Sequence, residues 1–205
     1  MTTVVLTPTH MASDHCVVRR GFPSETSVSL DNQKIFISPK KTMMIGAAGA
    51  LNAAEVNHPN TWEVLGLILT YYLAQIAENG LDSGGTYLDD DRVPMKNYAA
   101  VLDPDGTTFL VTRRYRFAIT SRGGSFYIKE LNSYAGIGTG GMYAAGLCAG
   151  GMNIHDIWPT VHKFDHLSSV EHTVIPISSL KLTPKLDASM RTVRDKILGV
   201  EGAKQ

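Results

Sequence analysis

The sequence is short of several features that would each define a class of protein. Its 205 residues include only two cysteines, Cys16 and Cys148, which is too few for a disulfide framework and typical of a reducing compartment. The 19 basic residues are balanced by 19 acidic ones, so no net charge attracts the chain to nucleic acid or to an anionic membrane. A content of 43% hydrophobic and 19% charged residues excludes intrinsic disorder.

Long apolar runs are also missing. The longest, 64–77, is interrupted by Thr70 and Gln75 and is shorter than the roughly 18 residues that indicate a membrane span. Residues 1–20 carry charged side chains and lack the apolar core of an export signal. We therefore expect a cytoplasmic protein with a single domain over residues 1–205.

Strand patterns occupy both halves of the chain. Runs rich in β-branched and apolar residues predict strands at 2–6, 11–14, 34–38, 42–48, 99–102, 107–112, 116–120, 125–128 and 172–177. Between the second and third of these runs lies a polar stretch that contains an alternating run at 26–30. Residues 80–95, with three glycines and three consecutive aspartates, read as a loop.

Helix patterns interrupt and follow the strands. The clearest helix covers 60–78, where Asn60 and Glu63 form a capping-box pattern and Asn79-Gly80 can end the helix. A helix of small residues at 140–152 and helices at 155–168 and 186–198 follow. Because strands and helices are segregated rather than alternating, the order predicts an α+β fold, a four-layer α-β-β-α sandwich with two antiparallel sheets.

Thr2 carries the most chemical information. An initiator methionine before a small residue is normally removed, which would leave threonine with a free α-amine beside its hydroxyl. Such an amine has a pKa of about 7.7–8.0 and can act as a general base at neutral pH. A terminal threonine activated by its own amine is a recognised nucleophile. By itself, however, a Met-Thr start is common and usually has no catalytic meaning.

Other motifs in the sequence give Thr2 a catalytic interpretation. Six short motifs follow one another in order: TTVV at 2–5, MASD at 11–14, QKIF at 33–36, IGAAG at 45–49, GTGGMYA at 138–144 and DHLS at 165–168. Together they resemble the proteasome β-subunit/HslV family of threonine peptidases, which are N-terminal nucleophile (Ntn) hydrolases. The resemblance spans about residues 2–178, almost the whole chain.

The resemblance implies a role for each matching residue. Thr2 would be the nucleophile, and its freed amine would take the hydroxyl proton. Lys34 would supply a positive charge that Asp14 holds in place. The Gly46 N–H would stabilise the oxyanion. The resemblance also implies a supporting hydrogen-bond network, formed by Thr139, Asp165 and Ser168. Two candidates for the specificity pocket are Met44 and Ile45.

The resemblance also implies an activity and partners. It implies an endopeptidase that acts on polypeptides through an acyl-enzyme, forms a ring-shaped homo-oligomer, works with an ATP-dependent unfoldase and needs no cofactor or metal. Nucleic acid and membranes are not expected partners. Because the family contains inactive members, the alternative is a structural or partner-binding subunit without activity. Retention of Met1 would block the α-amine and give an inactive form.

The sequence departs from the family pattern at three places. The spacing from Thr2 to Asp14 is about four residues shorter than in the family, and that from Asp14 to Lys34 is about four residues longer. A shorter first hairpin and a longer second loop would compensate. Thr139 stands where serine is usual, which keeps the hydroxyl, and the loop at 80–96 replaces much of a second helix.

Other sites stay open on the residues alone. Glycines at 136, 138 and 141 fit a dinucleotide-binding pattern, with Asp156 near the distance of a ribose contact, but no β-α-β unit surrounds them. Cys16 beside His15 could form a thiol nucleophile. His155, His162, His166 and His172 with Asp165 suggest a metal cluster, but without a further ligand pair at a recognisable spacing a partly exposed polar face is favoured. The aspartates at 89–91 lack the glycine and glutamate of a calcium loop, which favours a solvated loop.

Overall fold

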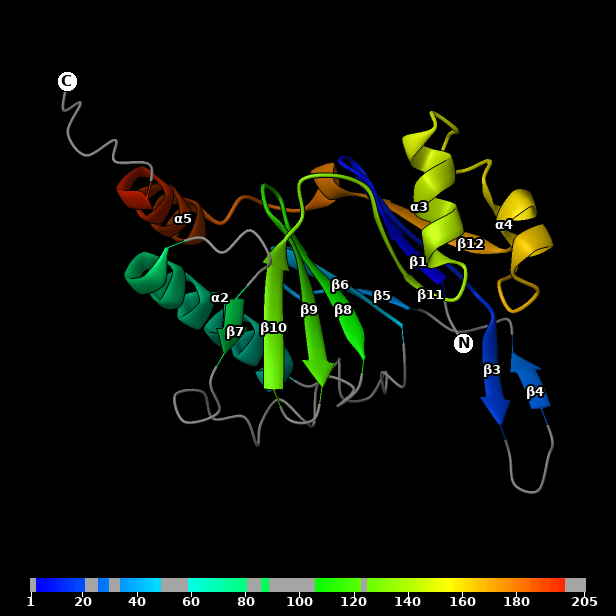
Figure 1. The fold of residues 1–205 in the computed structure, drawn as a ribbon, viewed down its shortest axis with the longest axis horizontal. Helices are drawn as coiled ribbons and strands as arrows, with labels where there is room; N and C mark the ends of the chain where they lie inside the picture. Colours follow the sequence, from blue (N-terminus) through cyan, green and yellow to red (C-terminus); the bar gives the residue numbers. More distant parts are fainter. Residues whose placement is uncertain are drawn as a thin grey trace.

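Two antiparallel sheets lie face to face between two pairs of helices in the computed structural model (Figure 1). The structure describes residues 3–20, 26–29, 34–48, 59–80, 86–88, 106–122 and 125–197. Within these residues, no helix is both long enough and apolar enough to cross a membrane.

The first sheet has four strands and contains the beginning of the described chain. Its order is β11-β1-β2-β12, with bounds β1 Thr3–Leu6, β2 His10–Asp14, β11 Ala135–Gly138 and β12 His172–Pro176. Thr3 lies opposite Gly138, and Asp14 lies opposite His172. The turn that joins β1 to β2 contains only three residues, so the first hairpin is short, as the spacing required.

The second sheet has six strands in the order β5-β6-β8-β9-β10-β7, and all neighbours are antiparallel. The bounds are β5 Ile35–Ile37, β6 Met43–Ala48, β7 Thr86–Leu88, β8 Thr107–Thr112, β9 Arg116–Arg122 and β10 Ser125–Glu130. The expectation of a loop over 80–95 is wrong at β7, which pairs with β10 at the edge of the sheet. The predicted strand at 99–102 and the aspartates at 89–91 lie outside the described residues.

A separate hairpin occupies part of the long stretch between Asp14 and Lys34. It consists of β3 (Val17–Arg20) and β4 (Thr26–Ser29), which pair with each other and project away from both sheets (Figure 1). The additional residues between the two predicted site residues therefore contribute to a hairpin, and the positions of Asp14 and Lys34 in the sandwich are kept.

The helices cover the outer faces of the sheets. On the second sheet lie α2 (Pro59–Asn79) and α5 (Pro184–Ile197); on the first lie α3 (Gly141–Ala149) and α4 (Trp158–Phe164), and a 3₁₀ turn, η2 (Ile177–Ser179), follows β12. The helix predicted at 60–78 is confirmed. The one predicted at 155–168 is shorter because Asp165 has an extended backbone and its side chain bonds to the turn that follows.

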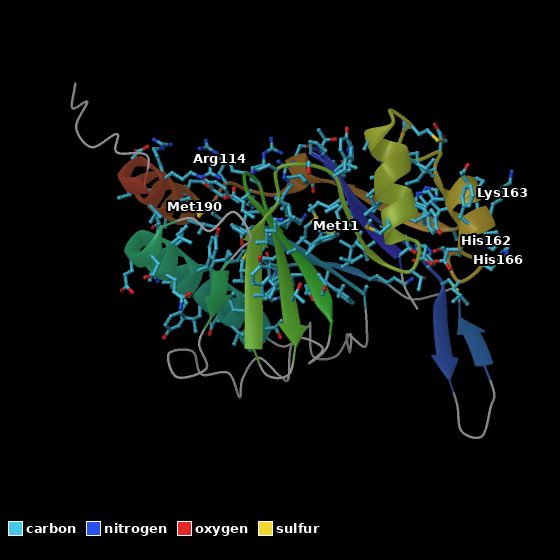
Figure 2. All side chains as sticks on the ribbon, in the orientation of Figure 1. Met11, Arg114, His162, Lys163, His166 and Met190 are labelled. Atoms are coloured by element: carbon cyan, nitrogen blue, oxygen red, sulfur yellow. The ribbon has the colours of Figure 1, made fainter. Side chains whose placement is uncertain are left out.

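Three apolar clusters fill the spaces between the four layers. Alternation along β8 shows the arrangement, since Phe109 and Val111 face the first sheet whereas Leu110 faces α2. Figure 2 shows Met11 between the sheets and Met190 on the outer helix α5, in agreement with their clusters. A third cluster joins α3 and α4 to the first sheet through Val5 and Trp158. The predicted α-β-β-α sandwich is therefore confirmed.

Candidate active site

The Asp14 carboxylate, at the end of β2, is fully buried, and each of its oxygens accepts two hydrogen bonds. Its Oδ1 accepts hydrogen bonds from the Thr3 N–H at 2.8 Å and from Lys34 Nζ at 2.5 Å. Its Oδ2 accepts bonds from the backbone N–H groups of Cys16 and Ser169, both at 3.1 Å. Four donors compensate for the loss of hydration that a buried charge suffers. Asp14 thus binds the start of β1 to the residue before β5.

Lys34 is the partner that the sequence predicted for Asp14. Its ammonium donates to Asp14 and to the Cys16 carbonyl oxygen, and only 6% of the residue is exposed. Burial lowers the pKa of Lys34 from its ordinary value of 10.5, and the attraction of Asp14 opposes this shift without cancelling it. The structure therefore brings together two predicted residues that are twenty positions apart.

A second carboxylate, Asp165, follows α4. Its Oδ2 accepts hydrogen bonds from the Thr139 hydroxyl at 2.6 Å and the Ser168 hydroxyl at 2.7 Å, and its Oδ1 accepts one from the Leu167 N–H at 3.1 Å. Asp165 is thus in contact with both other predicted members of the supporting network, Thr139 and Ser168. The methyl group that distinguishes Thr139 from serine does not prevent its hydroxyl from reaching the carboxylate.

The two carboxylate centres meet at Thr3, a residue that the sequence interpretation did not single out. Its N–H is bonded to Asp14, and its hydroxyl lies 2.5 Å from Ser168 Oγ and accepts the Gly140 N–H at 3.1 Å. The only signal in the sequence was its place directly after Thr2. Thr2 itself lies outside the described residues.

Three other predicted residues lie in the second sheet and do not join this network. Met44 and Ile45 are fully buried, Met44 between the sheets and Ile45 against α2. Gly46 lies between β5 and β8, opposite Ile35 and Phe109, and a Cβ there would lie 2.9 Å from Val4. The absence of a side chain at Gly46 therefore lets the two sheets pack closely at this point.

The competing sites gain no support from the described residues. Burial, and then Asp14, raise the pKa of the Cys16 thiol, which disfavours the thiolate, while His15 Nε2 bonds to Thr173. The glycine pattern at 136–141 is a close backbone contact between Gly136 and Gly141, and β11 is flanked by an antiparallel neighbour rather than placed in a β-α-β unit.

The histidines considered as an alternative metal cluster are likewise not arranged as a metal site in the described part of the chain. His162, Lys163 and His166 lie together at the outer end of the α3–α4 layer (Figure 2), and His162 Nδ1 donates to the Ser168 carbonyl at 2.6 Å. No group of three or more histidine, cysteine or acidic residues in the described part of the chain could hold a metal ion.

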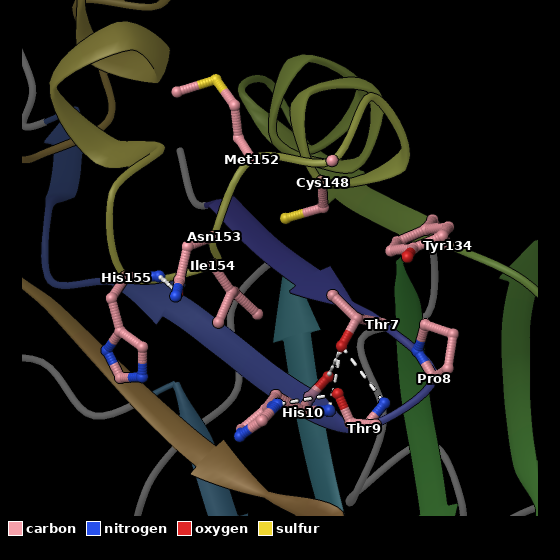
Figure 3. A pocket seen from close by; sticks show the side chains of 11 residues that line it. Thr7, Pro8, Thr9, His10, Tyr134, Cys148, Met152, Asn153, Ile154 and His155 are labelled. Atoms are coloured by element: carbon pink, nitrogen blue, oxygen red, sulfur yellow. Dashed lines mark hydrogen bonds between the residues drawn. The ribbon is translucent and has the colours of Figure 1, made fainter.

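A cavity of about 470 Å³ lies at the other end of the β1–β2 hairpin (Figure 3). It is lined by the turn at 7–10, by Cys148 in α3 and by the chain after α3, including Asn153 and His155. Within the described part of the chain, none of the residues predicted for the peptidase site lines this cavity. Its size alone does not assign it a role, because the buried charges lie at the Thr3 end of the hairpin.

The hydrogen bonds to Asp165 predict how stability changes in acid. Burial raises its pKa, but the hydroxyls of Thr139 and Ser168 and the Leu167 N–H favour the charged form, so the pKa is lowered from the ordinary value of 3.8. The carboxylate therefore contributes stability that is fully present above pH 3.8 and is lost as the pH falls through the folded-state pKa.

A Thr139→Val variant, which lacks one donor, should therefore unfold at a higher pH than the parent during acid titration followed by circular dichroism. Thr139→Ser, which keeps the hydroxyl, should behave like the parent. Equal midpoints for the parent and the valine variant would contradict this assignment of the Asp165 shift.

Comparison with known proteins supports the fold. No protein-family model matches the sequence, and no curated protein matches it by sequence. Among solved structures, eukaryotic HslV from Trypanosoma brucei matches with a TM-score of 0.52 at 15% identity, over 85% of this chain and 97% of that one. Anbu, an ancestral β-subunit, from Yersinia bercovieri matches with a TM-score of 0.46 at 12% identity, over 97% and 95% of the two chains.

A third match is Thiobacillus denitrificans BPH in complex with epoxomicin, with a TM-score of 0.44 at 15% identity over 86% and 98% of the chains. Identities this low show the fold alone. The chain therefore has the fold of the proteasome-like Ntn hydrolases, which is the fold that the sequence resemblance implied.

Proposed function

We propose that this chain is a threonine peptidase that cleaves peptide bonds through an ester on the Thr2 hydroxyl after Met1 has been removed. The observation that carries the proposal is that one buried carboxylate oxygen, Asp14 Oδ1, holds both the Lys34 ammonium and the N–H of Thr3. A buried cation is thereby fixed beside the residue that follows the candidate nucleophile.

Covalent geometry limits how far Thr2 can be from this cation. Consecutive Cα atoms are about 3.8 Å apart, and the Thr3 nitrogen is the atom that joins the two residues. An ammonium has three N–H donors, of which Asp14 and the Cys16 carbonyl take two. Those two oxygens are the acceptors of Lys34 Nζ among the described residues, and in this proposal its third N–H bonds to the Thr2 hydroxyl.

The proposed reaction begins with attack of the Thr2 oxygen on the carbonyl carbon of a substrate. The α-amine of Thr2 takes the hydroxyl proton, directly or through a water, and passes it to the leaving amine when the C–N bond breaks. Water then hydrolyses the ester and frees the second product and the Thr2 hydroxyl. Lys34 supports the attack because its charge favours deprotonated neighbours.

The remaining predicted residues have supporting parts in this mechanism. Asp165, Ser168 and Thr139 would hold the α-amine through the acceptor oxygen of Ser168. A backbone N–H of β6 would bind the developing oxyanion, and the resemblance alone assigns this role to Gly46. Met44 and Ile45 remain candidates for the specificity pocket on the same basis. They lie on opposite faces of β6, so a single pocket would contain only one of them.

Substrate and assembly follow from the same proposal. The substrate is a polypeptide, the chain forms a ring of identical subunits in the cytoplasm, and an ATP-dependent unfoldase delivers the substrate. The active sites of such a ring would face its interior, where folded proteins could not reach them. These parts of the proposal rest on the resemblance to proteasome-like hydrolases.

Two forms of the protein test the proposal directly. A cleavable fusion can release a chain that begins at Thr2 and another that retains Met1, and intact mass with N-terminal sequencing verifies each start. We expect only the Thr2 form to hydrolyse unstructured peptides, because only this form has a free amine on the nucleophilic residue. Two equally inactive, folded forms would favour the structural subunit instead.

A further inference from the structure

Thr3 is placed where it can control the residue before it. It is fully buried in β1, and each of its polar groups reaches a different part of the site. The N–H contacts Asp14 Oδ1 at 2.8 Å, and the hydroxyl contacts Ser168 Oγ at 2.5 Å. One residue therefore connects the Asp14–Lys34 pair to the Asp165–Ser168 pair.

The proton count fixes the direction of these hydrogen bonds. Ser168 has one hydroxyl proton, which it donates to Asp165 Oδ2 at 2.7 Å. The Thr3 hydroxyl must therefore donate to Ser168, while its own oxygen accepts the Gly140 N–H at 3.1 Å. The resulting chain runs from Gly140 through Thr3 and Ser168 to Asp165. Among the bonds of the described residues, it leaves one lone pair on Ser168 Oγ.

The space around the Thr3 hydroxyl leaves it little freedom. A Cβ added at Gly140 would lie 2.4 Å from both Thr3 Oγ1 and Ser168 Oγ, and 3.0 Å from Asp165 Oδ2. The glycine thus makes room for three polar atoms that are in close contact. A group held in this way keeps one orientation, as the preorganisation of a catalytic site requires.

From this geometry we infer that Thr3 is a positioning residue, which acts through Ser168 and Asp14 to fix the α-amine and the hydroxyl of Thr2. The inference rests on the proposed peptidase function. In the processed protein of the proposal, Thr2 is the one residue before Thr3. The hydrogen bonds that hold Thr3 therefore also fix the position of Thr2. The lone pair that remains on Ser168 Oγ is the acceptor for the amine.

Loss of the Thr3 hydroxyl should therefore slow the chemical step more than it weakens substrate binding. Valine keeps the branched shape, the pairing with Gly138 and the N–H bond to Asp14, so β1 can still form. A misplacement of about 1 Å at a reacting group can lower the rate about 100-fold. For Thr3→Val we expect kcat to fall about 100-fold with KM little changed, and Thr3→Ser to restore most of kcat.

Thr112→Val provides a matched control. Thr112 is also fully buried, and its hydroxyl donates to the Tyr115 carbonyl in the second sheet, away from the network. The Thr112→Val variant should be less stable than the parent but have the same kcat. Steady-state peptide hydrolysis by the assembled, Thr2-initiated protein gives kcat and KM for each variant, and a thermal melt verifies folding. If the valine variant does not fold, Thr3→Ala, which adds no atom, gives the same comparison.

A double-mutant cycle tests whether Thr3 acts through Ser168. In a Ser168→Ala background, Thr3→Val should lower kcat less than about 3-fold, because the group that it orients is already absent. A full second loss of about 100-fold would overturn the inference, as would a Thr3→Val protein as active as the parent. If the parent has no Thr2-dependent activity, the proposed function fails and the inference with it.

Discussion

Replacement of Thr2 by alanine should remove peptide hydrolysis, with a loss of at least about 1,000-fold in kcat. In the proposed mechanism the Thr2 oxygen forms the bond to the substrate, and no other group can take its place. Loss of the nucleophile in hydrolases of this general kind leaves only the residual rate due to binding and oxyanion stabilisation. Peptide hydrolysis by Thr2→Ala and by the parent, both without Met1, measures the effect.

A threonine outside the site controls for general damage. Thr192 is exposed on α5, and its hydroxyl donates to the Ala188 carbonyl within the helix. Thr192→Ala should hydrolyse peptides at the rate of the parent. If Thr2→Ala retained more than about a tenth of the parent activity, Thr2 could not be the nucleophile.

Replacement of Lys34 by alanine should have the second largest effect, because it affects both activity and stability. Asp14 would keep its charge in a fully buried position without its cationic partner. Removal of one member of a buried ion pair typically costs about 3–5 kcal/mol in the free energy of unfolding. With the cation absent from the Thr2 hydroxyl, we also expect kcat to fall about 100-fold or more.

Arg114 offers the matched control for this variant. Its ion pair with Asp187 is longer, at 3.5 Å, and 48% of the arginine side chain is exposed. Arg114→Ala leaves Asp187, which is buried, without its cation, so we expect the free energy of unfolding to fall while kcat stays unchanged. Urea unfolding and peptide hydrolysis measure the two effects. If Lys34→Ala lost stability yet kept the parent kcat, the Asp14–Lys34 pair would have a structural role only.

The Asp14–Lys34 pair shows how much local motifs can predict. Its members are separated by an unusual number of residues, yet each lies within a short motif at the end of a strand. The β1–β2 turn is short, and the β3–β4 hairpin lies between Asp14 and Lys34. Both differences in spacing therefore fall in connections, and the strands that carry the two residues keep their places. The network of Thr139, Asp165 and Ser168 was predictable for the same reason.

Thr3 could not be recognised from the sequence because its role depends on distant partners. Ser168 and Gly140 lie 165 and 137 positions away, and no periodic pattern links a threonine to such groups. Met44 and Ile45 illustrate the converse difficulty. An apolar run in a strand does not reveal whether its side chains line a pocket or fill a core, and here the alternation of β6 buries them on opposite faces of the sheet.

Short or edge elements were also difficult to predict. β7 has three residues and depends on pairing with β10, so its own residues carry little signal. Among the described strands, β3 pairs only with β4, and it lies beside a polar stretch, whereas a strand buried on one face would show an alternating pattern. The sandwich itself was predictable because its core strands and α2 have regular apolar patterns.

The central claim is that the terminal hydroxyl and amine of a processed chain react together, and peptide mapping after treatment with an epoxyketone tests it most directly. This electrophile forms a stable ring only with a residue that offers both groups. We predict a single adduct on the N-terminal peptide, on Thr2, that is absent from Lys34→Ala and from the form that retains Met1. A correctly processed, folded protein that carries no adduct on Thr2 would contradict the account.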